Sequence, residues 1–379
     1  MKKIIFVTGG HFTPAKAVIE ELIKEKELQI YYLGRKHALE GDKAISLEYQ
    51  EMKNDPRITF LEITTGRPQR KFTSKTLESL LKIPLGFLQS FFWICKYRPN
   101  LILSFGGYVA IPIATIAYFF RIPIVHHEQV LTFDYPSRYL AYLATKVLVS
   151  FPALVHGKNS QKWTYTGNPL RPEIFTANFP GELEPMRKLK EKKHLPLIYV
   201  TGGNQGSHVI NKVILGNLSE LLEDALLIWQ IGDSQEYQDF QAIQERLIVL
   251  PENKKERLVV KKFFLASEIG GVYTLADLVI ARSGANTVFE LAALGKPALL
   301  IPIPWVHHEE QQKNALTLAK TGLAVILDQD KLESDFLETL RAVVHKRSAL
   351  QRNAVIAKDL LVKKDSAAQI ARIVLQQLL

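Results

Sequence analysis

The chain has 379 residues, of which 47% are hydrophobic and 23% charged, a composition typical of globular proteins rather than disordered ones. That length exceeds one ordinary domain and is comfortable for two. A single cysteine, Cys95, excludes a disulfide framework and a cysteine-based zinc site, and it fits a reducing compartment. No run of 18 apolar residues occurs, so the sequence predicts no membrane-spanning helix.

The net charge of +10 indicates an anionic partner. Phosphorylated substrates, an anionic membrane surface and nucleic acid would all satisfy it. The chain carries no RNP, zinc-finger or helix-turn-helix signature, so we do not expect nucleic acid to be that partner.

Short β-branched runs alternate with amphipathic stretches along the chain, which predicts βαβ units around parallel sheets and an α/β fold. The first helix is expected to be capped by Thr13, with Pro14 in its first turn. The predicted strands are 3–8, 28–33, 101–105, 122–126 and 147–151, and then 197–201, 225–231, 257–260, 278–281, 298–301 and 324–327.

The two series of strands are separated by a proline-containing, basic stretch at 166–193. We therefore expect one Rossmann-like domain over 1–166 and a second over 167–354. The amphipathic segment 355–379 could pack back on the first domain. Both halves open alike, with IIFVTGG and LIYVTGG, each an apolar run that ends in Thr-Gly-Gly.

Glycines directly after a strand let the backbone approach a ligand, and the following helix N-terminus favours an anion. Gly202, Gly203 and Gly206 therefore form a candidate diphosphate site, although such glycines also serve tight packing alone. The dinucleotide pattern G-x-G-x-x-G is absent from both turns, which argues against a nicotinamide enzyme.

Histidines and carboxylates follow other predicted strands. His11 comes directly after Gly9 and Gly10, where a histidine could act as general base or simply pack in the turn. The run 126–129 (HHEQ) also ends a strand, but adjacent residues of a strand point to opposite faces, which disfavours a metal site.

A second polar region follows the strand at 278–281. Glu290 lies about one turn inside the next predicted helix, where its carboxylate could bind a ribose diol or serve only the helix N-terminus. The cluster 307–314 could bind sugar hydroxyls, which need paired donors and acceptors.

These motifs, in this order, resemble glycosyltransferase family 28, whose members have the GT-B fold of two Rossmann-like domains with parallel sheets facing across a cleft. The matching segments are TGGHFTPA (8–15), SFGGYVAIP (104–112), HEQ (127–129), VLVSFP (147–152), GNPLR (167–171), GGNQGS (202–207), the long run 276–304 and QQKNA (311–315).

The resemblance implies an inverting, metal-independent hexosyltransferase of peptidoglycan synthesis that needs no cofactor. Its donor would be UDP-N-acetylglucosamine, and its acceptor the undecaprenyl-pyrophosphoryl-linked muramyl peptide, lipid I. It would act peripherally at the cytoplasmic face of the cell membrane. The implied catalytic residues are His11 and Glu128, and the acceptor side comprises His127, Gln129 and Val130. The implied donor site comprises Thr8, Gly9, Gly10, Arg171, Gly203, Asn204, Gln205, Gly206, Ser283, Gly284, Ala285, Glu290, Gln311 and Asn314.

The chain departs from the family pattern at a few positions. Phe6 and Val7 stand where the first loop usually has glycines, Val130 replaces an Asn, and Asn204 replaces a Ser. The first three put acceptor-side detail in question, whereas Asn204 can still form hydrogen bonds.

Three other functions remain open: another GT-B transferase or an epimerase, a non-catalytic UDP-sugar-binding subunit at the membrane, and an NADP-dependent reductase that uses Arg35 and Lys36. The triplet 328–330 (DQD) could hold manganese in a metal-dependent transferase, but we expect it to cap the next helix.

The segment 80–97 is apolar and aromatic, with lysines at its flanks, which favours a membrane contact. Pro84 and Gly86 are expected to break it, so that a helix begins near Phe87. Phe91, Trp93 and Ile94 are expected to be buried. The predicted membrane patch consists of Ile83, Leu85, Phe87 and Leu88.

Overall fold

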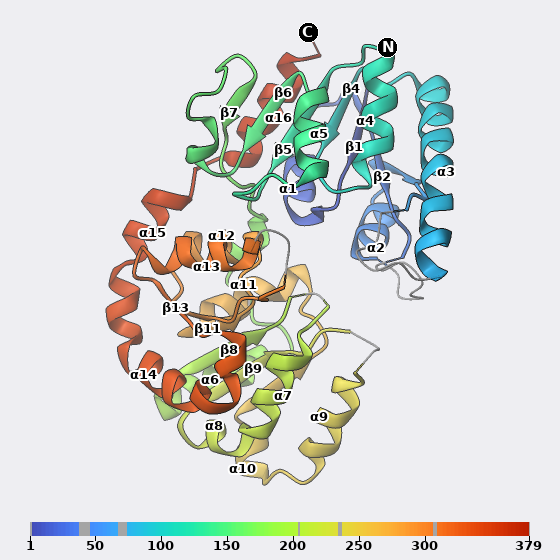
Figure 1. Cartoon of the computed structure of the whole chain (residues 1–379). Coiled ribbons are helices and arrows are strands. Elements are labelled where there is room, and N and C mark those ends of the chain that lie inside the picture. Colours follow the sequence, from blue (N-terminus) through green and yellow to red (C-terminus); the bar gives the residue numbers. More distant parts are fainter. Residues whose placement is uncertain are drawn as a thin grey trace. The chain divides into compact units, whose positions relative to one another are not determined.

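A computed structural model describes residues 2–37, 46–66, 74–203, 205–233, 237–305 and 309–378, and Figure 1 shows the order of its elements. The chain divides into two compact units. Unit 1 comprises Met1–Arg171 together with Lys363–Leu379, and unit 2 comprises Pro172–Val362. The sequence placed these boundaries after residue 166 and near residue 355, a few residues earlier in each case.

Unit 1 is built on a seven-stranded parallel sheet of order β3-β2-β1-β4-β5-β6-β7. Strand order therefore reverses between β1 and β4. The chain after β1 continues to one face of the sheet and the chain after β4 to the other, and open α/β sheets bind ligands at the carboxyl ends of the strands beside such a reversal. The strands are β1 (Lys3–Thr8), β2 (Leu28–Gly34), β3 (Ile58–Glu62), β4 (Leu101–Ser104), β5 (Ile124–Glu128), β6 (Lys146–Val149) and β7 (Trp163–Tyr165).

Helices cover both faces of this sheet (Figure 1). On one face α1, α2 and α16 bury Val18, Met52 and Ile370 against the inward side chains of β1 and β4. On the other face α3, α4 and α5 bury Ile94, Ile113 and Leu140. The helices are α1 (Phe12–Leu22), α2 (Leu47–Asn54), α3 (Ser74–Tyr97), α4 (Ala110–Phe119), α5 (Tyr135–Leu143) and α16 (Ser366–Gln376), with a 3-10 turn η1 (Pro152–Val155).

Unit 2 repeats this design with a six-stranded parallel sheet of order β10-β9-β8-β11-β12-β13. The α/β class and the two parallel sheets expected from the sequence are confirmed. The strands are β8 (Leu197–Thr201), β9 (Leu226–Gln230), β10 (Leu258–Lys261), β11 (Leu278–Ala281), β12 (Ala298–Leu300) and β13 (Ala324–Ile326).

One face of the second sheet packs against α7, α8, α9 and α14, which bury Ile210, Leu222, Ile243 and Phe336. The other face meets α11, where the ring of Tyr273 packs edge-on against Tyr199. Its helices are α6 (Leu183–Lys193), α7 (His208–Gly216), α8 (Leu218–Asp224), α9 (Asp239–Ile248), α10 (Glu252–Lys255), α11 (Ala266–Leu275), α12 (Ala285–Leu294), α13 (Glu310–Ala319), α14 (Leu332–Arg352) and α15 (Ala354–Leu361), with 3-10 turns η2 (Pro172–Phe175) and η4 (Gln329–Lys331).

Three local expectations were wrong. The cap of α1 is His11 rather than Thr13, because the helix already begins at Phe12. The helix α3 runs through Pro84 without a break. Asp328 precedes the turn η4 but forms no side-chain capping bond, so the DQD triplet is not a helix cap.

The membrane segment also differs in detail from its prediction. Leu85 and Leu88 are exposed as expected, whereas Ile83 and Phe87 are half-buried. Phe91 was expected in the core but is 49% exposed, while Ile94 is buried. Among the described residues, no helix is long and apolar enough to cross a membrane.

Candidate functional site

Two glycine turns meet at the carboxyl edge of the sheet in unit 1. The N–H of Gly10, after β1, donates to the carbonyl oxygen of Gly106, after β4, across 2.9 Å. A Cβ on Gly9, whose φ is +149°, would lie 2.7 Å from the backbone carbon of Phe105, so only glycine fits there. This contact holds the first turn, and His11 that follows it, against the end of β4.

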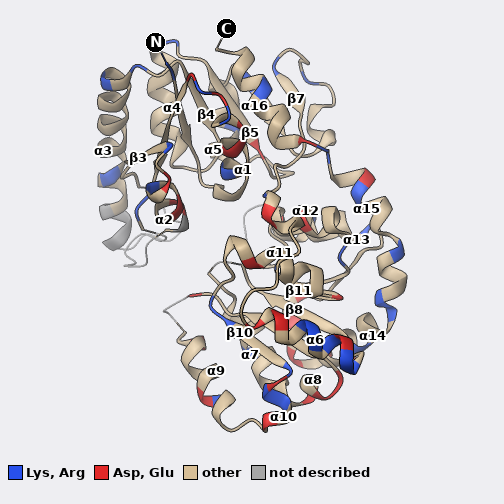
Figure 2. Ribbon diagram, turned by 180° about the vertical axis from the view of Figure 1, so that it is seen from behind, with Lys and Arg blue, Asp and Glu red and all other residues tan. Residues whose placement is uncertain are grey.

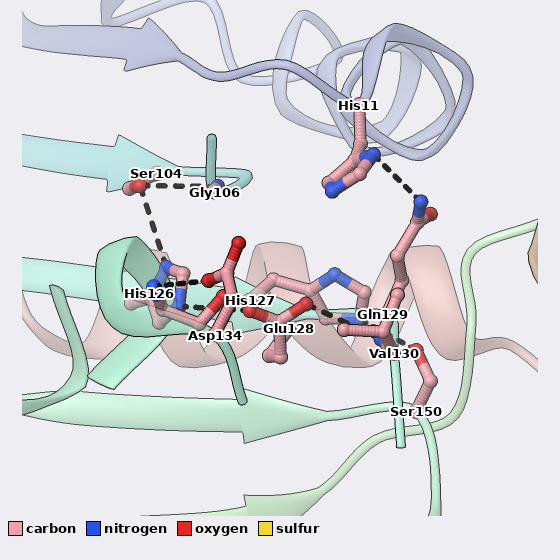
Figure 3. Close-up of polar contacts among 11 residues, drawn as sticks. His11, Ser104, Gly106, His126, His127, Glu128, Gln129, Val130, Asp134 and Ser150 are labelled. Atoms are coloured by element: carbon pink, nitrogen blue, oxygen red, sulfur yellow. Dashed lines mark hydrogen bonds and ion pairs between the residues drawn. The ribbon is translucent and has the colours of Figure 1, made fainter. Parts of the chain in front are cut away.

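His11 lies above the second glycine turn. Its Nδ1 is 2.7 Å from Nε2 of Gln129, and its ring is the nearest neighbour to the space that a Cβ on Gly106 would fill (Figure 3). Burial lowers the pKa of His11, partly opposed by the nearby charge of Glu128. The imidazole is therefore neutral at pH 7, as a general base must be.

The strand β5 sends its polar side chains in two directions, because residues alternate along a strand. His126 Nδ1 lies 3.4 Å from Ser104 Oγ, and His126 Nε2 lies 3.7 Å from Glu128 Oε2 (Figure 3). His127 instead places Nε2 3.2 Å from the carbonyl oxygen of Gly167 and 3.3 Å from Ser150 Oγ. His127 thus supports the chain that leaves β7, whereas Glu128 lies on the side of His126.

Two of these groups, His127 and Glu128, have strongly lowered pKa values, for different reasons. Burial lowers the pKa of His127 to about 4, so that this imidazole is neutral. Burial alone would raise the pKa of Glu128, but His126, His11 and the Ser137 hydroxyl together lower it to about 2. Glu128 is therefore an ionised carboxylate at pH 7, suited to stabilise a positive charge on a neighbouring imidazole rather than to donate a proton.

Among the described residues, the buried Thr8 Oγ1 and Gln129 Oε1 at this edge have no hydrogen-bond partner, while His126 Nε2 and Glu128 Oε2 lie 3.7 Å from each other, beyond hydrogen-bond distance. Buried polar groups are nearly always paired, so an unpaired group marks the place of a water or a ligand. Val130 is buried and its N–H donates to Glu128 Oε1 at 3.2 Å, so its backbone holds the carboxylate although its side chain is apolar.

In unit 2 the turn after β8 forms the candidate diphosphate site. The N–H of Gly203 donates to Thr201 Oγ1 across 3.0 Å, and apart from its chain neighbours no described residue lies within 4 Å of a Cβ built on Gly203. At Gly206, φ is +79° and a Cβ would lie 1.9 Å from the carbonyl oxygen of Ile231. Gln205 is exposed beside it, and Asn204 lies outside the described residues. The turn thus leads into α7 with open space beside Gly203, whereas Gly206 is packed closely against Ile231.

A second turn, after β11, joins several predicted donor residues. Ser283 Oγ donates to the carbonyl oxygen of Gln311 at 2.8 Å, and Asn314 Nδ2 donates to the carbonyl oxygen of Ser283 at 3.2 Å. Gly284 is the N-cap of α12, which begins at the buried Ala285. Asn314 Oδ1 is buried without a partner, so this turn also offers an unsatisfied polar atom.

Two further predicted donor residues lie near this turn: Gln311 through its contact with Ser283, and Glu290 on the helix that follows it. Gln311 Oε1 accepts from the N–H of Ile303 at 3.1 Å, which fixes the amide at the start of α13. Glu290 is buried on α12, and its Oε2 accepts from the hydroxyl of Tyr273 at 2.9 Å. Tyr273 was not predicted from the sequence, because nothing in the residues around it separates it from a core aromatic residue.

Arg282 was also missed. It is buried, and it donates to Ser207 Oγ at 3.0 Å, to the carbonyl oxygen of Ile301 at 2.9 Å and to Gln329 Oε1 at 2.7 Å. Burial lowers the pKa of Arg282 to about 10, and no carboxylate of the described residues pairs with it. The sequence feature that could have identified Arg282 is a cation directly after the apolar run of β11. Arg282 links the glycine turn of α7 to the turn η4.

The remaining predicted donor residues, Arg171, Thr8, Gly9 and Gly10, all belong to unit 1. Arg171 is half-buried and is the last residue of unit 1 before the chain enters unit 2. Thr8, Gly9 and Gly10, assigned to the donor, lie in unit 1 beside His11. Each unit thus presents a glycine turn and unsatisfied polar atoms at the carboxyl edge of its own sheet, an arrangement able to bind a polar, phosphorylated ligand.

Comparison with known proteins decides the family. Residues 7–149 match the glycosyltransferase family 28 N-terminal domain, and residues 197–371 match the family's C-terminal domain. The chain belongs to glycosyltransferase family 28. It is therefore a hexosyltransferase, as expected.

Curated relatives support the same family over most of the chain. A protein of Clostridium botulinum (strain Loch Maree / Type A3) is 31% identical over 342 residues, which cover 89% of each chain. A protein of Treponema denticola is 31% identical over 355 residues, 90% of this chain and 88% of its own. Both are named UDP-N-acetylglucosamine--N-acetylmuramyl-(pentapeptide) pyrophosphoryl-undecaprenol N-acetylglucosamine transferase.

Solved structures confirm the GT-B fold of this family 28 chain. MurG of Acinetobacter baumannii aligns with a TM-score of 0.68 at 23% identity and covers 99% of both chains. The glycosyltransferase of kitacinnamycin aligns with a TM-score of 0.69 at 16% identity, over 100% of this chain and 99% of its own.

Proposed function

We propose that this chain transfers N-acetylglucosamine from UDP-N-acetylglucosamine to the 4-hydroxyl of the muramyl sugar of lipid I, giving lipid II in peptidoglycan synthesis. The observation that carries the proposal is the 31% identity, over 89% of both chains, to a relative named for this reaction. The match extends through both units, including the turns whose polar atoms are unsatisfied.

The donor would bind unit 2. The N-terminus of α7, with Gly203, Asn204, Gln205 and Gly206, would hold the diphosphate through backbone N–H groups. Glu290 would accept hydrogen bonds from the ribose hydroxyls, with Tyr273 orienting its carboxylate. The sugar would contact the turn comprising Ser283, Gly284, Ala285, Gln311 and Asn314, and Arg171, Thr8, Gly9 and Gly10 complete the assigned donor residues.

The acceptor would bind unit 1, with His11 as general base. The acceptor hydroxyl loses its proton to His11 as its oxygen bonds to C1 of the sugar, and the bond from C1 to the phosphate oxygen breaks. UDP leaves with that electron pair. Because the hydroxyl attacks the face of C1 opposite the leaving UDP, the configuration at C1 is inverted. The carboxylate of Glu128 stabilises the imidazolium that forms, and His127, Gln129 and Val130 shape the acceptor side.

The chain would meet its lipid-linked acceptor through an apolar patch on unit 1, at the cytoplasmic face of the cell membrane. Four side chains at helical spacing on α3 are exposed: Leu81, Leu85, Leu88 and Phe92. Phe119, at the end of the neighbouring α4, is 75% exposed. Basic segments lie along α3 (Figure 2), and apolar side chains beside cations suit an anionic lipid surface.

The decisive experiment measures UDP release from UDP-N-acetylglucosamine with and without a lipid I analogue, together with identification of the product. Acceptor-dependent release and a disaccharide product support the proposal. Formation of an epimerised sugar, or UDP binding without turnover, would instead favour an epimerase or a binding subunit.

A further inference from the structure

Gln129 and His11 form a close side-chain pair in unit 1. Gln129 is buried, its Nε2 lies 2.7 Å from Nδ1 of His11, and its Oε1 is buried without a partner (Figure 3). An amide N–H can only donate, so in this orientation Nδ1 of His11 accepts. The proton of the neutral ring then sits on Nε2, and His11 has no lone pair free to take another.

The opposite orientation of the same amide reverses these roles. A half-turn of the Gln129 amide places Oε1 against Nδ1, where oxygen accepts from Nδ1–H. The lone pair then lies on Nε2. Nε2 faces the second glycine turn, 3.7 Å from where a Cβ on Gly106 would lie. Because Gly106 lacks that Cβ, a substrate hydroxyl has space to reach the ring there.

The second state also suits the protonated ring. Burial, the largest effect, and His126 lower the pKa of His11, whereas Glu128 and Asp134 raise it and so favour the imidazolium. When His11 takes the acceptor proton on Nε2, both ring nitrogens carry N–H. Oε1 of Gln129 can then keep its bond from Nδ1–H throughout, while an amide N–H in that position would face another N–H donor.

We propose that Gln129 is a positioning residue whose side-chain amide decides which nitrogen of His11 carries the proton, and that transfer uses the orientation in which Oε1 accepts from Nδ1–H. This inference rests on the proposed function of His11 as general base. It assigns a role in proton transfer to a residue that otherwise only borders the acceptor side.

Two substitutions separate the roles of the amide. Gln129→Met keeps the approximate size but removes both hydrogen-bonding groups, so neither tautomer of His11 is held. Gln129→Glu supplies only acceptors, so the carboxylate holds Nδ1–H and raises the pKa of His11. Gln29→Met is the matched control, because the Gln29 amide also donates to a side chain, the hydroxyl of Tyr31, but lies away from the site.

The first measurement is independent of activity. In protein labelled with ¹⁵N-histidine, His11→Gln identifies the His11 signals among those of the 10 histidines. We expect a single tautomer in the wild type, a mixture in Gln129→Met and the Nδ1–H form or the imidazolium in Gln129→Glu. If Gln129→Met leaves the tautomer of His11 unchanged, Gln129 does not set it and the inference is overturned.

The second measurement is the pH profile of transfer. We expect Gln129→Met to lower kcat by roughly 10-fold or more with the donor KM unchanged. Gln129→Glu should keep kcat within about 3-fold at its optimum and move the acidic limb upward by about one pH unit. A Gln129→Glu enzyme as slow as Gln129→Met, with Nδ1–H held, would overturn the working orientation. Absence of transfer in the wild type would refute the proposed function but not the tautomer result.

Discussion

The hydroxyl of Tyr273 on α11 donates a hydrogen bond to Oε2 of Glu290 on α12 across 2.9 Å, deep inside unit 2. A buried carboxylate that is held in this way has a fixed direction. If Glu290 binds the ribose, the bond to Tyr273 sets which lone pairs remain for the two hydroxyls.

We expect Glu290→Ala to raise the donor KM by about 10- to 100-fold, because hydrogen bonds to a charged group contribute about 1.5–3 kcal/mol. Tyr273→Phe should raise it by only about 3- to 10-fold, since the carboxylate remains but loses its orientation. Steady-state kinetics with varied donor test both variants. A donor KM unchanged in Glu290→Ala would remove Glu290 from the ribose site.

His11→Ala should lower kcat far more than it weakens donor binding. Loss of a general base costs about 10²- to 10⁴-fold in rate, whereas the assigned diphosphate and ribose contacts lie in unit 2. Single-turnover rates and a UDP binding titration check the two effects separately. Weak UDP binding combined with a normal kcat would instead make His11 a donor-site residue.

Acid should destabilise the fold of unit 1 through His127. Its pKa falls from 6.5 to about 4 on folding, so the unfolded chain binds the proton first as pH drops below 6.5. The free energy of unfolding is therefore unaffected by His127 above about pH 6.5. It falls progressively between pH 6.5 and pH 4, by roughly 3 kcal/mol in all.

Urea unfolding of the wild type and of His127→Gln at several pH values between 7 and 4 tests this effect. The variant should show a flatter dependence of the free energy of unfolding on pH in that range. Below about pH 4.5 both proteins should lose stability further, because Glu128 has a pKa of about 2 in the fold. Parallel curves for the two proteins would contradict the prediction for His127.

Transfer should survive EDTA. The carboxylates of Asp328 and Asp330 are exposed, and Gln329 between them accepts from Arg282, so the DQD triplet is arranged as a turn. We expect full activity after chelation and in a variant carrying Asp328→Ala and Asp330→Ala. Loss of activity on chelation, with recovery in manganese, would establish a metal-dependent mechanism.

Removing exposed apolar groups from α3 should weaken membrane binding. Leu85→Ser with Leu88→Ser should reduce co-sedimentation with anionic vesicles and activity on a long-chain lipid acceptor, while sparing a short-chain soluble acceptor. Binding of the wild type should fall with salt, since each surface cation contributes about 1 kcal/mol.

The matched control is Val355→Ser with Leu360→Ser on α15, where two apolar side chains are 67% and 59% exposed in unit 2. This control should bind vesicles as the wild type does. Equal vesicle binding by the α3 variant in low salt would place the membrane contact elsewhere.

The sequence predicted most of the sheet positions, because parallel strands buried on both faces are short apolar runs. The strand β3 was missed because its five residues, ITFLE, include the exposed Thr59 and Glu62 and so form no continuous apolar run, and β7 has only three residues. The alternation of side chains along β5 correctly predicted that His127 points in a different direction from His126 and Glu128. No sequence pattern, however, could pair Gln129 with His11, since their contact depends on how two glycine turns pack.

The helix α3 shows why local rules failed elsewhere. Gly86 was taken as a break, yet it lies within the helix and lets it approach Thr65, whose Cβ would be 2.8 Å from a Cβ at residue 86. Ser90 Oγ donates to the carbonyl oxygen of Gly86 at 2.7 Å. Tertiary packing thus overrode the helix-breaking tendency of Pro84 and Gly86.

The helix α16 lies against α1, although more than 340 residues separate the two in the chain. Ile370, Ala371 and Val374 belong to the same core as Val18 and Leu22. During synthesis, the first sheet therefore leaves the ribosome with this face covered only by α1 and α2, and unit 2 is complete before α16 emerges. Unit 1, which starts to form first, would be the last to finish folding. Deleting the final helix should thus harm the half of the protein that is made earliest.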